Sequence, residues 1–191
     1  MPRVAALSPS VLPAGAAAVC ERFTAGGRFA DQAAVLAHVP PALEHLYAMI
    51  EALNTRAATP RRYIELGIVV ASRLNACQYC VASHAPILAV EGLSQAAVDH
   101  LPEPGHPDMD EADNAVIAYA REVTLQAYRI DDALFDRLRG FLSEAQIVEL
   151  TLRIALAGFF NRFNDALQID DGRSAGVPAA GPASTSQGIE R

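Results

Sequence analysis

Apolar residues recur at steps of three and four through long stretches of this sequence, and that spacing constrains the fold more than any other feature. One stretch follows Pro40 and Pro41, which suit the first turn of a helix. Its apolar positions are Leu43, Leu46, Ile50 and Leu53. Because this spacing places them on one face of an α-helix, we expect a helix that ends near Asn54.

Two further helices are expected on either side of residue 75. Pro60 can open a helix whose positions up to Leu74 are apolar almost all round, so this helix should be buried. Asn75 is a suitable N-cap, with Gln78 three positions later as in a capping box. We therefore expect the next helix to run from about Ala76 to about Glu91, followed by Gly92 as the left-handed residue beyond its end.

The second half of the sequence predicts four more helices. A short one follows the cap Ser94 and ends at His100, and the proline-rich residues 101–107 form a loop. Others span residues 110–126 and, after a cap at Asp131 or Asp132, residues up to Leu138. A long last helix begins at Ser143. Its apolar stripe at the helical period consists of Val148, Leu152, Ala155, Phe159, Phe163 and Leu167.

The end of that last helix carries four polar residues, which are Asn161, Arg162, Asn164 and Asp165. They interrupt otherwise apolar surroundings. Such a group can be a solvated face or a polar contact with a neighbouring subunit, and the sequence leaves both open.

Composition agrees with an all-α fold. The chain has 191 residues, 51% of them hydrophobic, with no Trp and 6% aromatic residues, which favours helices packed through small side chains. We expect one compact helical domain over residues 1–170, a bundle of about seven to eight helices. Residues 171–191 are rich in Gly, Ser, Ala and Pro, and we expect a disordered tail there.

Charge and hydropathy exclude several classes of partner. A net charge of -7 and a pI near 5.2 argue against nucleic acid and against an anionic membrane surface. Pro9 and Pro13 interrupt the apolar N-terminal stretch, and no later apolar run reaches about 20 residues, so neither a secretory signal nor a membrane span is expected. The sequence predicts a cytoplasmic protein.

Cys77, Cys80 and His84 form a C-x-x-C-x-x-x-H motif within one predicted helix. Residues three and four apart on a helix share a face, so the two thiols and the imidazole should lie within contact distance. If Asn75 is the cap, Cys77 lies in the first turn, where the backbone N–H groups and the helix dipole stabilise a thiolate. This pattern predicts redox chemistry at sulfur.

The motif contains the parts of a dithiol cycle. The imidazole of His84 can take the proton of Cys80, directly or through water, and the thiolate can then attack a peroxide oxygen or a disulfide sulfur. A sulfenic acid on Cys80 would be captured by Cys77 as an intramolecular disulfide. We therefore expect a thiol-dependent peroxidase or disulfide reductase of the antioxidant class.

Three alternatives remain open for the same residues. The cysteines can be inert residues of a structural core. They can bind zinc together with His84, with a further ligand from Cys20, His38, His45, His100 or His106. They can also form a redox sensor, in which the disulfide forms without turnover. A thioredoxin-like module is disfavoured because the sequence has no βαβ pattern.

Glu65 followed by the C-x-x-C-x-x-x-H motif in consecutive helices resembles the alkylhydroperoxidase D-like (AhpD-like) branch of the carboxymuconolactone decarboxylase superfamily. The resemblance covers residues 43–92, and the Phe-rich last helix is similar to the closing helix of that family. It implies an all-α fold, assembly into trimers or hexamers, and peroxidase activity on organic hydroperoxides or hydrogen peroxide without haem, metal or another cofactor.

By the same resemblance, Cys80 is the peroxidatic cysteine, Cys77 the resolving cysteine, His84 the relay histidine and Glu65 the distant proton acceptor. The implied partners are a hydroperoxide substrate and an unidentified thiol or dithiol electron donor. Tyr79 departs from the family, because the better-studied peroxidases have a His immediately before the second cysteine. A tyrosine is neutral near pH 7 and cannot act as a second imidazole base. Cys20 matches no part of the pattern and is expected to be a small apolar residue in an N-terminal helix.

Overall fold

The computed structural model describes residues 2–25 and 29–169, and it confirms the all-α fold. The disordered tail expected at residues 171–191 lies outside the described residues. Within the described ranges there are nine α-helices and two short 3-10 helices, slightly more than the seven to eight expected. The α-helices are α1 (Ala14–Ala25), α2 (Ala30–Leu36), α3 (Pro40–Thr55), α4 (Arg61–Leu74), α5 (Gln78–Val90), α6 (Gln95–His100), α7 (Glu111–Gln126), α8 (Asp132–Arg139) and α9 (Glu144–Leu167).

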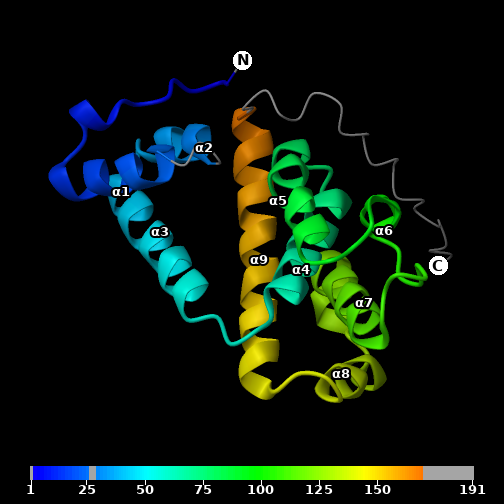
Figure 1. Cartoon of the computed structure of the whole chain (residues 1–191). Coiled ribbons are helices and arrows are strands. Elements are labelled where there is room, and N and C mark those ends of the chain that lie inside the picture. The colour runs from blue at the N-terminus through cyan, green and yellow to red at the C-terminus, as the bar shows by residue number, and fades with distance from the viewer. Residues whose placement is uncertain (1, 26–28, 170–191) are drawn as a thin grey trace, which may run out of the picture.

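Helix α9 runs through the middle of the molecule, with α1, α2 and α3 on one side and α4 to α8 on the other (Figure 1). The larger core joins α4, α7 and α9 and includes Leu66, Val70, Val116, Ile117 and Leu150. A smaller core joins α1, α2 and α3 and includes Cys20, Leu36, Leu43 and Tyr47. Cys20 is fully buried in α1, as the sequence predicts.

Gly67 allows α4 and α9 to lie close together. A Cβ atom at this position would meet the Ile154 side chain at 3.0 Å and the Leu150 side chain at 3.2 Å, closer than side chains normally pack. The two helices run in the same direction, because Thr59, just before α4, bonds to Gln146 near the start of α9, and Ser72 bonds to Asn161 near its end. The polar end of α9 is therefore held against the junction between α4 and α5.

The apolar stripe noted in the sequence of α9 does not mark its buried face. Val148, Leu152 and Phe159 are 68%, 37% and 46% exposed. The buried positions are Ile147, Glu149, Leu150, Arg153, Ile154, Ala157, Gly158, Asn161 and Asn164. Because α9 is apolar on more than one side, periodicity alone does not select the face that packs against α4.

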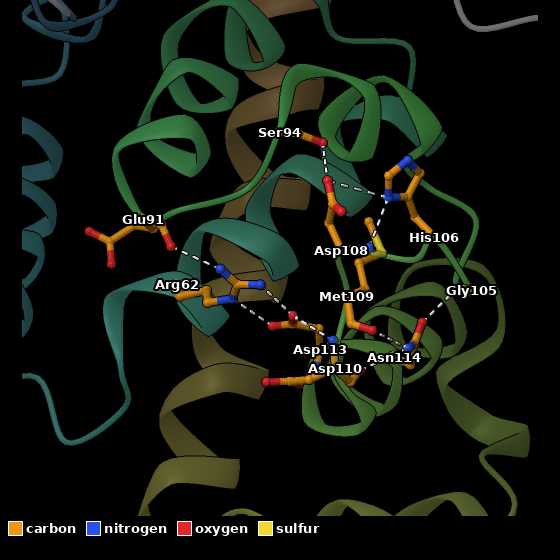
Figure 2. A network of polar contacts seen from close by, with 10 residues as sticks. All are labelled: Arg62, Glu91, Ser94, Gly105, His106, Asp108, Met109, Asp110, Asp113 and Asn114. Carbon is orange, nitrogen blue, oxygen red and sulfur yellow. Dashed lines mark hydrogen bonds and ion pairs between the residues drawn. The ribbon is translucent and has the colours of Figure 1, made fainter.

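A polar network ties the start of α4 to the end of α5 and the start of α7 (Figure 2). The Arg62 guanidinium donates to both carboxylate oxygens of Asp113, at 2.8 and 2.5 Å, and to the carbonyl of Glu91 at 2.8 Å. Asp113 is fully buried and also accepts the backbone N–H of Asp110, the cap of α7. This bidentate pair replaces the water that a buried carboxylate would otherwise need.

Asp113→Ala should lower the free energy of unfolding by about 3 kcal/mol, because it leaves a partly buried guanidinium without its carboxylate. Asp136→Ala is the matched control, since its pair with Arg139 is exposed on both sides and should contribute less than about 1 kcal/mol. Equilibrium unfolding in urea measures both changes. Equal losses of unfolding free energy in the two variants would contradict a larger contribution from the buried pair.

Candidate active site

The junction between α4 and α5 positions both cysteines of the motif. Ala76 has a left-handed backbone, with φ of 59°, and ends α4. The N–H of Ala76 donates to the carbonyl of Arg73, and the N–H of Cys77 donates to the carbonyl of Ser72 at 2.9 Å. This pair of bonds is a Schellman motif, here with alanine in place of the usual glycine. Cys77 thereby becomes the N-cap residue of α5, and Cys80 lies in its first turn.

The predicted capping role of Asn75 is therefore wrong. Asn75 is the C-cap of α4, and its side chain donates to the Asn161 carbonyl oxygen on α9 at 2.9 Å. The sequence pattern of a capping box was misleading because the chain turns through Ala76 before α5 begins. As a result, Cys77 lies at the N-cap of α5 and Cys80 in its first turn, so both sulfurs lie at the helix end whose dipole favours a thiolate.

A chain of side-chain hydrogen bonds orients an amide toward the Cys80 sulfur. The Tyr47 hydroxyl on α3 donates to the Gln32 carbonyl oxygen on α2 at 2.8 Å. The Gln32 amide then donates to the Asn164 carbonyl oxygen at 3.0 Å, and the Asn164 amide donates to the Cys80 Sγ at 3.3 Å. Each carbonyl oxygen is engaged, so each amide must present its N–H groups to the next residue.

The two thiols differ in acidity. A hydrogen bond from the Cys77 thiol lowers the pKa of Cys80, and the amides of Asn161 and Asn164 lower it further against the opposing effect of burial. The same hydrogen bond to Cys80, together with burial, raises the pKa of Cys77. The arrangement favours a Cys80 thiolate that accepts hydrogen bonds from a protonated Cys77.

Asp165 is a further polar neighbour of Cys77. It lies at an exposed position of α9, where its carboxyl shares a hydrogen bond with the Cys77 thiol and partial desolvation raises the pKa of Asp165. Cys77 itself is fully buried. All three cysteines are free thiols in the structure.

His84 and Glu65, which the family resemblance assigns to one proton relay, form the second pair of the site. The Nδ1 atom of His84 lies 2.7 Å from Oε2 of Glu65, and the Glu65 side chain is only 9% exposed. Although Glu65 lies near the start of α4, its carboxylate is buried and has the imidazole as its partner. A proton on Nδ1 shared with this carboxylate leaves Nε2 as the basic nitrogen of His84.

Cys80, His84 and Glu65 line one cavity of about 420 Å³, whereas Cys77 and Tyr79 are not among its lining residues. The walls come from α1 to α5 and α9, and they are mostly apolar, with Phe23, Phe29, Tyr47, Ile50, Ile68 and Phe160. Two arginines, Arg61 and Arg153, also line it. A volume of this size fits an organic molecule rather than a water-sized one, which occupies about 30 Å³.

Sequence reasoning missed the residues that hold the Cys80 sulfur. Asn161 and Asn164 were noted as a solvated face or a contact between subunits, yet both are fully buried within this chain. The available signal was that these two asparagines are three residues apart on the helix and have apolar residues around them in the sequence. Gln32 and Tyr47 gave no signal, because their role depends on how α2 and α3 pack against α9.

The described residues include no group of three or more His, Cys, Asp or Glu side chains placed to hold a metal ion. His38 bonds to the carbonyl of Ala5, and Cys20 lies in the separate core of α1 to α3. No helix in the described ranges is long and apolar enough to cross a bilayer.

Comparison with known proteins confirms the resemblance predicted from the motif. Residues 40–122, from α3 into α7, match the model of the carboxymuconolactone decarboxylase family. No curated protein is significantly similar to the chain.

Solved structures share the fold. An AhpD core protein from Ralstonia eutropha JMP134, an uncharacterized peroxidase-related protein, superposes with a TM-score of 0.75 at 22% identity, over 88% of this chain and 91% of that one. A candidate antioxidant defence protein of the AhpD type from Agrobacterium tumefaciens gives 0.63 at 24% identity, over 71% and 93%. The debrominase Bmp8 bound to 2,3,4-tribromopyrrole gives 0.64 at 19% identity, over 74% and 76%.

Replacing Asn164 should change the acidity of Cys80 in a graded way. Asn164→Ala removes a donor to the sulfur and should raise the pKa of Cys80. Asn164→Asp, which has nearly the same shape but places a negative charge near the sulfur, should raise it further. Ultraviolet thiolate absorbance against pH measures both, in a Cys20→Ser background. An unchanged titration in both variants would contradict the role of this amide.

Proposed function

Because residues 40–122 belong to the carboxymuconolactone decarboxylase family and the fold is AhpD-like, we propose that this protein is a thiol-dependent peroxidase of the antioxidant class. Its substrates are organic hydroperoxides. The observation that carries the proposal is the Cys80 sulfur, which borders an organic-sized cavity, accepts amide hydrogen bonds and has a second thiol beside it. Cys80 is the peroxidatic and Cys77 the resolving cysteine.

The first step is attack by the Cys80 thiolate on the terminal oxygen of the hydroperoxide. The O–O bond breaks, Cys80 becomes a sulfenic acid, and the alkoxide leaves with a proton as an alcohol. That proton comes from the Cys80 thiol: Glu65 holds Nδ1 of His84, and Nε2 takes the thiol proton and returns it to the alkoxide. Apolar walls around the sulfur exclude water and strengthen these electrostatic contacts.

The second step forms the disulfide. Cys77 attacks the Cys80 sulfenic acid, a sulfur–sulfur bond forms, and hydroxide leaves and is protonated to water. Because the pKa of Cys77 is raised, the thiol needs a base at this moment, and Asp165 shares a hydrogen bond with it. A thiol or dithiol donor then reduces the disulfide. The free thiols suit the reducing cytoplasm, which we propose as the location.

One equivalent of cumene hydroperoxide should remove two thiols from the wild-type protein without adding oxygen mass. Cys77→Ser should gain the mass of one oxygen on Cys80, because its sulfenic acid has no resolving partner, and Cys80→Ser should not react. Cys20→Ser is the control and should behave as wild type, since Cys20 is buried in a separate core. Thiol titration and intact mass spectrometry measure the number of free thiols and the added mass in all four proteins. Unchanged thiols throughout would refute a peroxidase function.

The His84 and Glu65 pair is tested by the pH dependence of the rate. In the wild type, the rate should rise as pH increases, because only the Cys80 thiolate reacts, and the rise should lie below the ordinary cysteine pKa of about 8.5. Glu65→Gln should lower kcat/KM by about a hundredfold, and added imidazole should partly restore a His84→Gly variant. Glu51→Gln, at an exposed ion pair, is the charge-matched control. If Glu65→Gln has the same kcat/KM and the same pH dependence as the wild type, Glu65 takes no part in the mechanism.

Two alternatives use the same residues. A redox sensor would form the Cys77–Cys80 disulfide but would not turn over with any peroxide and donor. A zinc protein would bind about one zinc per chain, lost in Cys80→Ser, and metal analysis after purification under reducing conditions distinguishes it. A structural protein, in which the cysteines only pack, would bind no metal and would keep its thiols unchanged in the presence of peroxide. Since the debrominase Bmp8 shares the fold, a brominated pyrrole is a useful comparison substrate in the thiol titration described for cumene hydroperoxide.

We also propose that the protein forms a homo-oligomer, a trimer or a hexamer. Val148, Leu152 and Phe159 on α9 leave apolar surface exposed in the single chain, which supports burial against another copy. Light scattering should give three or six times the chain mass of 20.3 kDa, and Phe159→Glu should lower it. A single-chain mass for the wild type would contradict this assembly.

A further inference from the structure

A thiol donor that reduces a Cys77–Cys80 disulfide can attack either sulfur, and the surroundings of the two sulfurs decide between them. Attack on one sulfur expels the other as a thiolate, and exchange is faster when the expelled thiolate is the more stable one. The amides of Asn161 and Asn164 stabilise a thiolate on Cys80, the second of them through a bond of 3.3 Å to the sulfur. Cys80 is therefore the better leaving group, and the chemistry favours attack on Cys77.

Cys77 cannot be attacked from the cavity, because it is not among the residues that line it. Its side chain has no exposed surface. However, the carboxyl that shares a hydrogen bond with its thiol belongs to Asp165, which lies at an exposed position of α9. Cys77 is also the cap of α5, so its sulfur lies at a helix end. Cys77 therefore lies beneath the surface beside the end of α9, away from the cavity.

The N-terminal segment, residues 3–7, lies over this part of the surface (Figure 1). The backbone N–H of Arg3 donates to the carbonyl of Leu167 at 2.8 Å, and its Nη1 donates to the carbonyl of Ala166 at 3.0 Å. Both carbonyls follow Asp165 directly in the chain. The side chain of Val4 packs against the apolar cluster that contains both cysteines of the motif, together with Val35, Tyr79 and Ile169. The N-terminal segment thus helps to enclose the dithiol on the side opposite to solvent access through the cavity.

This cover is lightly held. Residues 3–7 form no helix or strand, and only Val4 and Leu7 among them are partly buried. Beyond Arg3, the segment is held by the ring of His38, which donates to the carbonyl of Ala5 at 2.8 Å, and by the backbone N–H of Leu7. Chain segments with few buried apolar contacts open at a small cost in free energy, whereas the helices beneath open only with the core. The N-terminal segment can therefore move away while the rest of the site stays folded.

Resting on the proposed peroxidase function, we propose that the thiol donor enters beneath residues 3–7 and attacks the Cys77 sulfur, so that peroxide and donor reach the dithiol from different sides. The donor thiolate forms a bond to the Cys77 sulfur, the Cys77–Cys80 bond breaks, and Cys80 leaves as a thiolate. A second donor thiol then attacks the donor sulfur of this mixed disulfide. Cys77 leaves and takes up a proton, for which Asp165 is its bonded neighbour. The donor ends as a disulfide, and its two electrons have passed to the protein.

The first test locates the mixed disulfide. The wild-type protein is oxidised with diamide, which forms the disulfide without peroxide, and is then treated briefly with 2-mercaptoethanol and quenched with acid. Peptide mass spectrometry identifies the cysteine that carries the 2-mercaptoethanol. The adduct is expected on Cys77, with Cys80 as a free thiol. An adduct on Cys80 would overturn the inference, because the donor would then have entered through the cavity.

The second test loosens the cover. Val4→Ala removes apolar contact with the cluster and should raise the rate at which dithiothreitol reduces the disulfide by about fivefold. The rate of thiol loss with cumene hydroperoxide should stay at the wild-type value, since Val4 does not line the cavity. Val11→Ala is the matched control, because Val11 is 67% exposed in the short 3-10 helix Pro9–Val11, and both rates should be unchanged. An unchanged reduction rate in Val4→Ala, or an equal rise in both rates, would contradict a separate entrance for the donor.

Oxidation by diamide separates this inference from the peroxidase function. If cumene hydroperoxide leaves the thiols unchanged, but the adduct forms on Cys77 and Val4→Ala speeds reduction, the donor entrance stands without the peroxidase function. If cumene hydroperoxide does form the disulfide and the adduct is found on Cys80, the peroxidase function stands and the donor entrance is wrong.

Discussion

The amide of Asn164 lies between the core of the helix bundle and the reactive sulfur, and much of the site depends on it. It reaches Cys80 because α9 is buried along the face that carries Asn161 and Asn164, and because Gln32 fixes its orientation from the opposite side. Tyr47 in turn fixes Gln32. Helices α2 and α3, which belong to a separate small core, are therefore coupled to the sulfur through a chain of three hydrogen bonds.

The backbone turn between α4 and α5 gives the two cysteines different surroundings. The Schellman turn at Ala76 places Cys77 at the cap of α5 and puts Cys80 inside its first turn. Cys80 borders the cavity and accepts hydrogen bonds, whereas Cys77 is enclosed and donates one. In the proposed mechanism, the attacking and the resolving thiol differ because of the fold of this short junction, since the side chains themselves are identical.

Helices α7, α8 and α9 could be predicted from the sequence because each combines apolar periodicity with a local cap. Ser143 and Gln146 form the capping box at the start of α9, and Asp131 caps α8, as their positions predict. The pair of His84 with Glu65 was anticipated from the family resemblance, and the structure brings these two side chains together.

Other features depend on long-range packing and left little local trace. Ala76 adopts a left-handed backbone that a glycine would have signalled, and so Asn75 resembled a helix start. Burial of Asn161 and Asn164 is decided by which face of α9 meets α4, and several faces of that helix are apolar. Arg153 drew no attention in the sequence, because an arginine on a long helix is usually solvated. Asn161 and Asn164 act on the Cys80 sulfur without lining the cavity, and Arg153 lines it.

The most direct test of the account is the order in which the cysteines of the wild-type protein react with iodoacetamide as pH is raised, with each modified site identified by mass spectrometry. The account predicts that Cys80 is alkylated first, at a pH below that of an ordinary cysteine, while Cys77 and Cys20 stay unmodified. Alkylation of Cys77 before Cys80 would contradict it, because the thiolate would then belong to the residue at the cap of α5 and not to the one that borders the cavity.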